Sequence, residues 1–155
     1  MPTPCTPAGR LVAAFGDPTR MAALYAPHIE WSLPRSMVSL PRPMVGRAAV
    51  EAFNRAVWEV HYFPDCSVEI LDETGDAQRS AVRFMYRARH RATGVLYENL
   101  YTVFVRSGPD GITEVFEDLD TLAMVEVLRR GGQIGDTFRG LAAAAAATAT
   151  RSPGE

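Results

Sequence analysis

The sequence predicts an α+β fold: a cone-shaped, curved antiparallel sheet with helices packed across its concave face. Up to Phe63 the apolar residues recur mostly at helical spacing, whereas from Cys66 to Leu119 they recur at every second position, as in half-buried strands. Turn-forming stretches (TGD, ATG and SGPDG) divide this second part into four strands. Helices followed by such a meander fold as two layers, and a curved sheet then wraps a pocket.

The composition is that of one soluble domain. The chain has 155 residues, of which 47% are apolar and 22% charged, with a formal net charge of -2. This balance argues against nucleic acid as a partner, and no apolar run reaches the roughly 20 residues that span a bilayer. Cys5 and Cys66 have no metal-ligand spacing, and no nucleotide or zinc motif or leader peptide occurs. We therefore expect a cytoplasmic protein that uses no cofactor or metal.

The two ends of the chain differ from its middle. Residues 1–10 contain three prolines and predict a flexible N-terminal segment. Residues 131–155 include a run of alanines and predict a low-complexity, disordered tail. The folded domain is expected to span residues 11–130.

Two short helices are expected between Leu11 and Leu24. Gly16 would end the first, and Asp17 followed by Pro18 is typical of the cap and first position of the second. The stretch HIEWSLP alternates apolar and polar residues and predicts a half-buried strand. Three prolines after it force a loop, which would form the rim or lid of a pocket.

The segment GRAAVEAFNRAVWEVHYF carries the clearest helical pattern. Val50, Phe53, Val57 and Val60 are spaced for one apolar face, and charged side chains four residues apart form a ladder on the other side. A last helix is expected in TLAMVEVLRRGG, after the sheet.

Three stretches resemble a known group of proteins. LYAPHIEW resembles a helix-to-strand junction, GRAAVEAFN a long helix and VFVRSGPDGITEVFEDLDT a final hairpin of the nuclear transport factor 2-like superfamily, in its SnoaL-like polyketide cyclase and ketosteroid isomerase-like branch. The resemblance covers about Leu11 to Leu128. It implies the cone-shaped fold and leaves the reaction open, because this fold carries isomerases, polyketide cyclases, dehydratases, epoxide hydrolases and binding proteins.

Pattern and resemblance together select the side chains that face the pocket. On the second strand of the meander, Val82, Phe84 and Tyr86 form the more apolar face, which is the natural inner one. Alternation alone does not decide between the two faces of the third strand. The resemblance implies that Asn99 and Tyr101 point inward, since the hydrogen-bond donor of ketosteroid isomerases aligns near Tyr101.

The last hairpin ends in three acidic residues with different expected roles. The register of the family implies that Glu117 points inward and Asp118 outward, while Asp120 caps the last helix. A carboxyl group among aromatic side chains loses hydration, so its pKa should rise toward neutrality, which suits a general acid or base. We interpret Glu117 as catalytic, with Tyr101 and Asn99 holding or polarising a carbonyl or hydroxyl. The alternatives are a rim position or salt bridge for Glu117 and core hydrogen bonds for the other two.

Six further side chains are predicted to bind the substrate by shaping the pocket. They are Trp31, Phe53, Trp58, His61, Phe84 and Tyr86. His61 would lie at the pocket mouth, and simple packing is its alternative.

Two known mechanisms of the superfamily fit the sequence poorly. The limonene-epoxide-hydrolase branch carries its basic aspartate at the position of Glu117, but it also uses an arginine and a second aspartate where this chain offers Phe84 and Tyr86. The base of ketosteroid isomerases falls at Leu33 or Ser32, and neither can act as a carboxylate base.

The leading hypothesis is a general acid/base enzyme that needs no cofactor: a cyclase, isomerase or dehydratase acting on an apolar, oxygenated small molecule such as a polyketide or terpenoid intermediate. The alternatives are a non-catalytic binding or dimerisation module and an epoxide hydrolase of the limonene-epoxide-hydrolase type. Arg83, Met85, Arg87 and Arg89 lie on the outer face of the sheet, and we expect a homodimer through that face, with a solvated charged surface as the alternative.

Overall fold

The computed structural model describes residues 4–37, 43–130, 139–140, 143–144 and 146. Within these residues one six-stranded sheet has the strand order β2-β1-β6-β5-β4-β3. The strands are β1 (Tyr25–Ser32), β2 (Met44–Val45), β3 (Ser67–Gly75), β4 (Arg79–Arg89), β5 (Leu96–Gly108) and β6 (Gly111–Leu119). The helices are α1 (Pro7–Val12), α2 (Pro18–Ala22), α3 (Arg47–Arg55), the π-helix η1 (Ala56–His61) and α4 (Thr121–Arg130).

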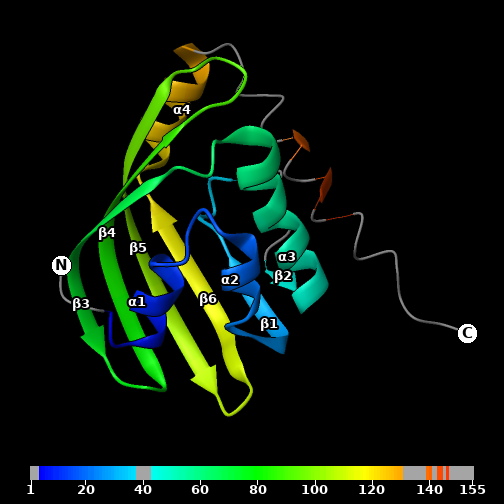
Figure 1. Ribbon diagram of the computed structural model, residues 1–155, viewed down its shortest axis with the longest axis vertical. Coiled ribbons are helices and arrows are strands. Elements are labelled where there is room, and N and C mark those ends of the chain that lie inside the picture. The colour runs from blue at the N-terminus through cyan, green and yellow to red at the C-terminus, as the bar shows by residue number, and fades with distance from the viewer. Residues whose placement is uncertain (1–3, 38–42, 131–138, 141–142, 145, 147–155) are drawn as a thin grey trace, which may run out of the picture.

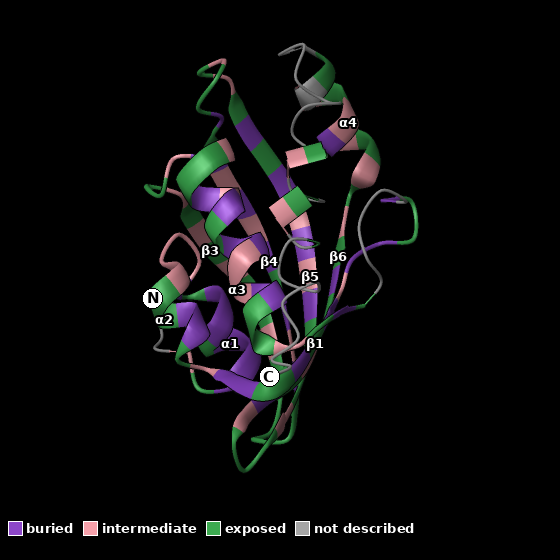
Figure 2. Ribbon diagram, turned by 90° about the vertical axis from the view of Figure 1, so that its right-hand side faces the viewer, coloured by how far each residue is buried: buried purple, intermediate pink, exposed green. Residues whose placement is uncertain are grey.

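The molecule has two layers, as the sequence predicts. Helices α1, α2 and α3 lie across one face of the curved sheet, and α4 follows β6 at one end of it (Figures 1 and 2). The α+β fold is therefore confirmed. None of the helices in the described residues is long and apolar enough to cross a membrane.

The register of the sheet brings distant segments together on the concave face. Strands β3 to β6 form the predicted antiparallel meander. Strand β1 adds to β6 in parallel, with Trp31 opposite Val115. On the other side of β6, Val103 of β5 lies opposite Glu117. A residue and the one two positions beyond its partner on the next strand share a face and are diagonal neighbours. Trp31 and Tyr101 are both diagonal neighbours of Glu117, one on each side of β6.

The core lies between the concave face and the helices. The predicted inner residues of β4, Val82, Phe84 and Tyr86, are buried, and so are Asn99 and Tyr101 of β5. The predicted strand around HIEWSLP is β1, and its alternate apolar residues are buried. The cap and first position expected for the second helix are also confirmed, since the Asp17 side chain accepts a hydrogen bond from the amide of Arg20 at 3.0 Å.

Helix α1 begins earlier than the sequence suggested, within the segment expected to be flexible. It starts at Pro7, and Thr6 is its N-cap: the hydroxyl accepts a hydrogen bond from the Gly9 amide at 3.1 Å. The same hydroxyl donates to Glu73 of β3 at 2.7 Å, and Ala8 is fully buried. Proline fits the first turn of a helix, so a proline taken as a sign of irregular chain here starts a helix. Residues 7–10 are therefore helical, the flexibility expected of residues 1–10 stays a prediction, and residues 1–3 lie outside the described part.

The predicted long helix changes its geometry halfway. Helix α3 continues into η1, where amides bond to carbonyls five residues back, so the buried face shifts relative to an α-helix. Trp58 is buried, while Val60, expected on the apolar face, has 60% of its surface exposed. The charge ladder is present, with Arg55 and Glu59 paired at 3.1 Å.

The expected disordered tail is described at a few positions only. Residues 139–140, 143–144 and 146 are helical, and Ala144 packs against the core. Alanine has the highest helix propensity of all residues, which agrees with the helical geometry of the described alanines. The remaining positions of the predicted tail, together with 38–42 of the predicted rim loop, lie outside the described residues.

Candidate active site

A partly enclosed cavity of about 80 Å³ lies between the concave face of the sheet and the helices. Apolar and aromatic side chains from every layer line it, together with a few polar groups. The lining residues are Phe15, Trp31, Leu33, Met37, Phe53, Asn54, Val57, Trp58, Tyr62, Tyr86, Tyr97, Tyr101, Glu117, Leu119 and Met124. This volume is below the roughly 150 Å³ of a cavity that holds benzene, but the cavity is not fully enclosed, so part of a longer molecule can lie outside it.

Glu117 is the acidic group of this cavity. It is 8% exposed, and the inward register of β6 directs it between Trp31 and the tyrosines of β5. The indole Nε1 of Trp31 donates a hydrogen bond to its Oε2 at 2.9 Å. Burial raises the pKa of Glu117 to about 7, and the bond from Trp31 offsets only part of that rise.

The other two acids of the hairpin are placed as predicted. Asp118 is exposed. Asp120 caps α4, because its Oδ1 accepts hydrogen bonds from the amides of Leu122 and Ala123, both at 3.0 Å. Alternation along β6 therefore puts only Glu117 of the three into the cavity.

A chain of hydrogen bonds on β5 orients the hydroxyl of Tyr101. The amide Nδ2 of Asn99 donates to the Tyr97 hydroxyl at 2.7 Å and to the carbonyl of Asp120 at 2.8 Å. The Tyr97 hydroxyl accepts from Asn99 and also shares a hydrogen bond with the Tyr101 hydroxyl, 2.8 Å away, in which either oxygen can be the donor. When Tyr97 is the donor in this pair, the hydrogen of Tyr101 is available to a group inside the cavity. Burial raises the pKa of Tyr97 to about 12 and that of Tyr101 well above its usual value, so both remain neutral donors.

A second polar pair belongs to the aromatic wall. The indole Nε1 of Trp58 donates to the Tyr86 hydroxyl at 2.8 Å, and the ring of Phe15 packs edge-on against Tyr86 with centroids 6.1 Å apart. The hydrogen of the Trp58 indole is thereby already used, and Trp58 presents mainly an apolar surface.

The structure brings six of the nine predicted site residues to the cavity. They are Glu117, Tyr101, Trp31, Phe53, Trp58 and Tyr86. Their placement at the cavity follows the predicted faces, and the catalytic and binding roles remain predictions.

Three predicted site residues do not line the cavity. Phe84 is fully buried beneath the wall, with its ring stacked on Tyr101 at 5.4 Å, because the side chains above it close the surface. Asn99 points inward but is held under the start of α4, where it positions Tyr97. His61 ends η1, and the π-geometry turns it away from the cavity while the next residue, Tyr62, lines it. Burial and the nearby His90 lower the pKa of His61.

Sequence reasoning missed the polar residues Asn54 and Tyr97. Tyr97 lies two positions before Asn99 on the same face of β5, so the alternation already contained it. Asn54 follows Phe53 on the buried side of α3, where a polar side chain interrupts an apolar face. This polar residue within an apolar helical face was the signal that could have identified Asn54. In the described residues no group of three histidine, cysteine or acidic side chains could hold a metal ion.

The fold and the internal acid define the class of protein: a curved α+β sheet of the nuclear transport factor 2-like type enclosing a small cavity. Comparison with family models makes the assignment specific. The model of the SnoaL-like domain matches residues 10–115, and the chain belongs to this family.

Solved structures share this fold at low sequence identity. An NTF2-like protein of unknown function from Burkholderia pseudomallei K96243 has a TM-score of 0.65 at 20% identity, covering 76% of this chain and 91% of that one. A hypothetical protein with a ketosteroid isomerase-like fold from Catenulispora acidiphila DSM 44928, in complex with trimethylamine, has 0.62 at 14%, covering 79% and 89%. A protein from Jannaschia sp. CCS1, named as a candidate SnoaL-like polyketide cyclase, has 0.63 at 12%, covering 78% and 90%. The chain matches none of the curated proteins with which it was compared.

Proposed function

We propose that this protein is a cofactor-independent enzyme in which Glu117 transfers a proton within a small, mostly apolar, oxygenated molecule. The reaction is an isomerisation, cyclisation or dehydration next to a carbonyl group. Membership of the SnoaL-like family agrees with this class of chemistry. A polyketide or terpenoid intermediate is the expected kind of substrate, and the proposed location is the cytoplasm.

The burial of the Glu117 carboxyl group at the cavity wall is the observation that carries the proposal. Among the described residues Glu117 is the one acidic side chain that is buried, and its pKa of about 7 lets it accept and return a proton near neutral pH. Structural networks also shift pKa values, but within the described residues this carboxyl group is hydrogen-bonded only to an indole, and it faces a cavity.

The chemistry follows from the two polar groups on the wall. Ionised Glu117 removes a proton from a carbon next to the substrate carbonyl; the electrons of the broken C–H bond form an enolate, and its oxygen accepts the hydrogen bond of Tyr101. Glu117, now protonated, returns the proton to another carbon in an isomerisation. In a dehydration it gives the proton to a departing hydroxyl group, which leaves as water. In a cyclisation the enolate carbon attacks a second carbonyl, and the proton goes to the new alkoxide.

A non-catalytic binding module is the second candidate. The small volume of the cavity favours it, because about 80 Å³ is less than the roughly 300 Å³ typical of sites for larger ligands. In that case Glu117 and Tyr101 would only bind a small polar molecule.

Proton exchange tests the choice between the two candidates without knowledge of the natural substrate. Butanone and hydroxyacetone are incubated with the protein in deuterated water, and loss of their α-proton signals is followed by NMR. The wild type should accelerate exchange, Glu117→Gln should lower the rate by roughly 100-fold or more, and Asp118→Asn should leave it unchanged. No acceleration by the wild type, or equal rates in wild type and Glu117→Gln, would favour the binding module.

We also propose that two copies associate through the outer face of the sheet. Phe104 and Phe116 are 52% and 46% exposed there and contact each other with ring centroids 6.5 Å apart. Strand β5 lies between β4, which carries arginines, and β6, which carries acidic residues. A two-fold axis along β5 would therefore place β4 of one copy against β6 of the other. Light scattering at high micromolar concentration should show a dimer, and Phe116→Lys should give a monomer. A monomeric wild type would contradict the proposal.

A further inference from the structure

Asn54 is a buried polar residue at a position that favours an apolar one. It lies on the inner side of α3, is 2% exposed and lines the cavity. Asparagine is a poor residue for the middle of a helix, because its side chain competes for backbone hydrogen bonds, and burying its amide costs free energy unless partners are present. The stability of α3 therefore does not explain why this residue is here.

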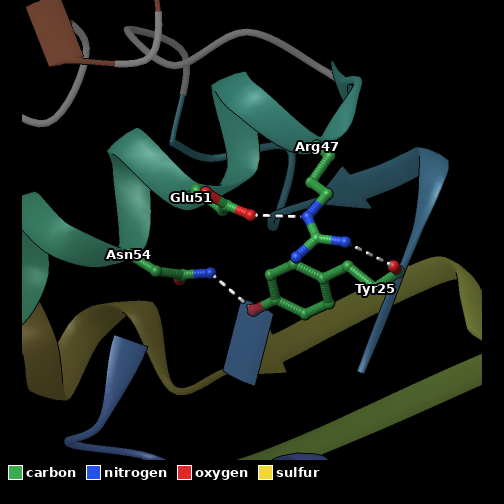
Figure 3. A network of polar contacts seen from close by, with 4 residues as sticks. All are labelled: Tyr25, Arg47, Glu51 and Asn54. Atoms are coloured by element: carbon green, nitrogen blue, oxygen red, sulfur yellow. Dashed lines mark hydrogen bonds and ion pairs between the residues drawn. The ribbon is translucent and has the colours of Figure 1, made fainter. Parts of the chain in front are cut away.

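Contacts outside the cavity wall hold the amide of Asn54 in one orientation (Figure 3). Its Nδ2 donates to the hydroxyl of Tyr25 at 2.7 Å. The ring of Tyr25 packs edge-on against Trp31, with centroids 6.2 Å apart. Arg47 donates to the Tyr25 carbonyl at 3.5 Å and pairs with Glu51 at 2.6 Å. Tyr25 is thus fixed at its hydroxyl, its ring and its backbone, and it fixes Asn54.

The other end of the Asn54 amide is not used by the described part of the chain. Its oxygen accepts no hydrogen bond from those residues, although its nitrogen is bonded. The oxygen of Asn99 is also without a partner, but it is buried away from the cavity. The Asn54 oxygen is not among the fully buried unpaired atoms of the described residues, so a ligand that donates a hydrogen bond can reach it.

The polar groups of the wall form a complementary set. Tyr101 has a hydrogen to donate when Tyr97 is the donor in their shared bond, Glu117 can exchange a proton, and the oxygen of Asn54 can accept. The Tyr62 hydroxyl is a further polar group of the wall, with no hydrogen bond to the described part of the chain, and the remaining lining residues are apolar or already engaged in hydrogen bonds. A molecule that satisfies all three groups has one acceptor, one donor and an acidic C–H bond within a short carbon frame.

We infer that Asn54 recognises a hydroxyl group of the substrate and that the substrate class is small hydroxy ketones. This inference rests on the proposed function for the carbonyl, which binds Tyr101, and adds the hydroxyl, which binds Asn54. Asn54 acts by positioning and selection and takes no proton itself. A simple ketone leaves the Asn54 oxygen unpaired and binds less tightly.

Matched pairs of probes test the inference through binding alone. Hydroxyacetone and butanone differ by a hydroxyl in place of a methyl group, and diacetone alcohol and methyl neopentyl ketone form a longer pair with the same difference. Dissociation constants are measured by following amide NMR resonances. One neutral hydrogen bond predicts that the wild type prefers the hydroxy ketone of at least one pair by about fivefold. Equal affinities, or a preference for the plain ketone in both pairs, would overturn the inference.

Variants identify the residue that recognises the hydroxyl. Asn54→Leu keeps the approximate size and removes the acceptor, so the preference should disappear with little change in the affinity for butanone. Tyr25→Phe removes the bond that orients Asn54 and should weaken the preference, which provides a second test if Asn54→Leu does not fold. Ser80→Ala is the control, because Ser80 is buried and accepts a hydrogen bond from Ala8 outside the cavity. A preference that survives in both Asn54→Leu and Tyr25→Phe would assign the hydroxyl to Glu117 and overturn the role of Asn54.

Failure of the inference about Asn54 can be distinguished from failure of the proposed enzymatic function. Glu117→Gln should retain the preference for the hydroxy ketone while losing proton exchange. If exchange fails in the wild type but the preference depends on Asn54, the protein binds hydroxy ketones without transforming them. If exchange depends on Glu117 but the protein shows no preference for the hydroxy ketone, the proposed enzymatic function is supported and Asn54 does not select the substrate.

Discussion

Glu73 and Glu117 are two glutamates on the concave side of one sheet, and their pKa values move in opposite directions. Glu73 accepts hydrogen bonds from the hydroxyl and amide of Thr6 and from the amide of Cys5, and these bonds lower its pKa. Glu117 accepts one bond from an indole in a buried cavity, and loss of hydration raises its pKa. The comparison shows that the number of donors and the access of water decide the charge, whereas the position on the sheet does not.

The largest expected effect is on the pH dependence of stability at Glu117. Its folded-state pKa of about 7 lies above the ordinary value of 4.5, so its stabilising contribution is fully present below that ordinary value and is lost as the pH rises through the folded pKa. This shift corresponds to about 3 kcal/mol. Denaturant unfolding of the wild type and Glu117→Gln on both sides of this range should show the wild type losing that amount relative to the variant. A difference that does not change with pH would contradict the burial of the carboxylate.

The next effect concerns the single donor to Glu117. Trp31→Phe removes the indole hydrogen bond while keeping an aromatic ring, so the pKa of Glu117 should rise further, by roughly one unit. The carboxyl carbon resonance of Glu117, followed against pH, measures it. Trp58→Phe is the matched control, since its indole bonds to Tyr86, and there the pKa of Glu117 should stay in place. Equal pKa values in wild type and Trp31→Phe would show that the indole bond does not stabilise the anion.

A smaller effect is expected where Glu73 meets α1. Thr6→Ala removes the N-cap of α1 and one of the donors to Glu73, and should lower the free energy of unfolding by about 1 kcal/mol. Thr19→Ala, at an exposed site in α2, should change it by less than about 0.5 kcal/mol. Equal losses in the two variants would mean that the Thr6 contacts add nothing to stability.

The smallest effect has the opposite sign from that at Glu117. Because its folded pKa is lowered, Glu73 contributes stability above its ordinary pKa of 4.5 and loses it as the pH falls. Glu73→Gln should reduce this acid-side loss by less than about 1 kcal/mol, since solvent screens the group. Unfolding at neutral and acidic pH measures the difference. If the contribution of Glu73 to the free energy of unfolding instead fell as the pH rose, its pKa would be raised like that of Glu117, which would contradict the contrast between the two glutamates.

Periodicity and family register were sufficient to predict the sheet and the inward face that carries Glu117. Alternation in a strand fixes which side a residue faces, so Trp31, Tyr101 and Glu117 could be placed together. It does not fix depth: Phe84 and Asn99 face inward yet lie below or beside the cavity, because neighbouring side chains cover them.

Helical spacing failed where the helix itself changed. The rule of 3.6 residues per turn put Val60 inside and His61 at the mouth, but η1 has wider turns, which leave Val60 exposed and place Tyr62 rather than His61 at the cavity. Periodicity alone gave no sign of this change. Asn54 was visible as a polar interruption, but its meaning depended on Tyr25, which comes from another element.

Because of the positions of the two tryptophans, the intrinsic fluorescence of the protein reports on the cavity. The chain contains two tryptophans, and both line the cavity. All tryptophan fluorescence of the folded protein therefore originates at the cavity wall. One of the two indoles is bonded to a carboxyl group that changes charge near neutral pH. Emission intensity should follow the titration of that group, and a ligand that enters the cavity should change the spectrum without any added dye.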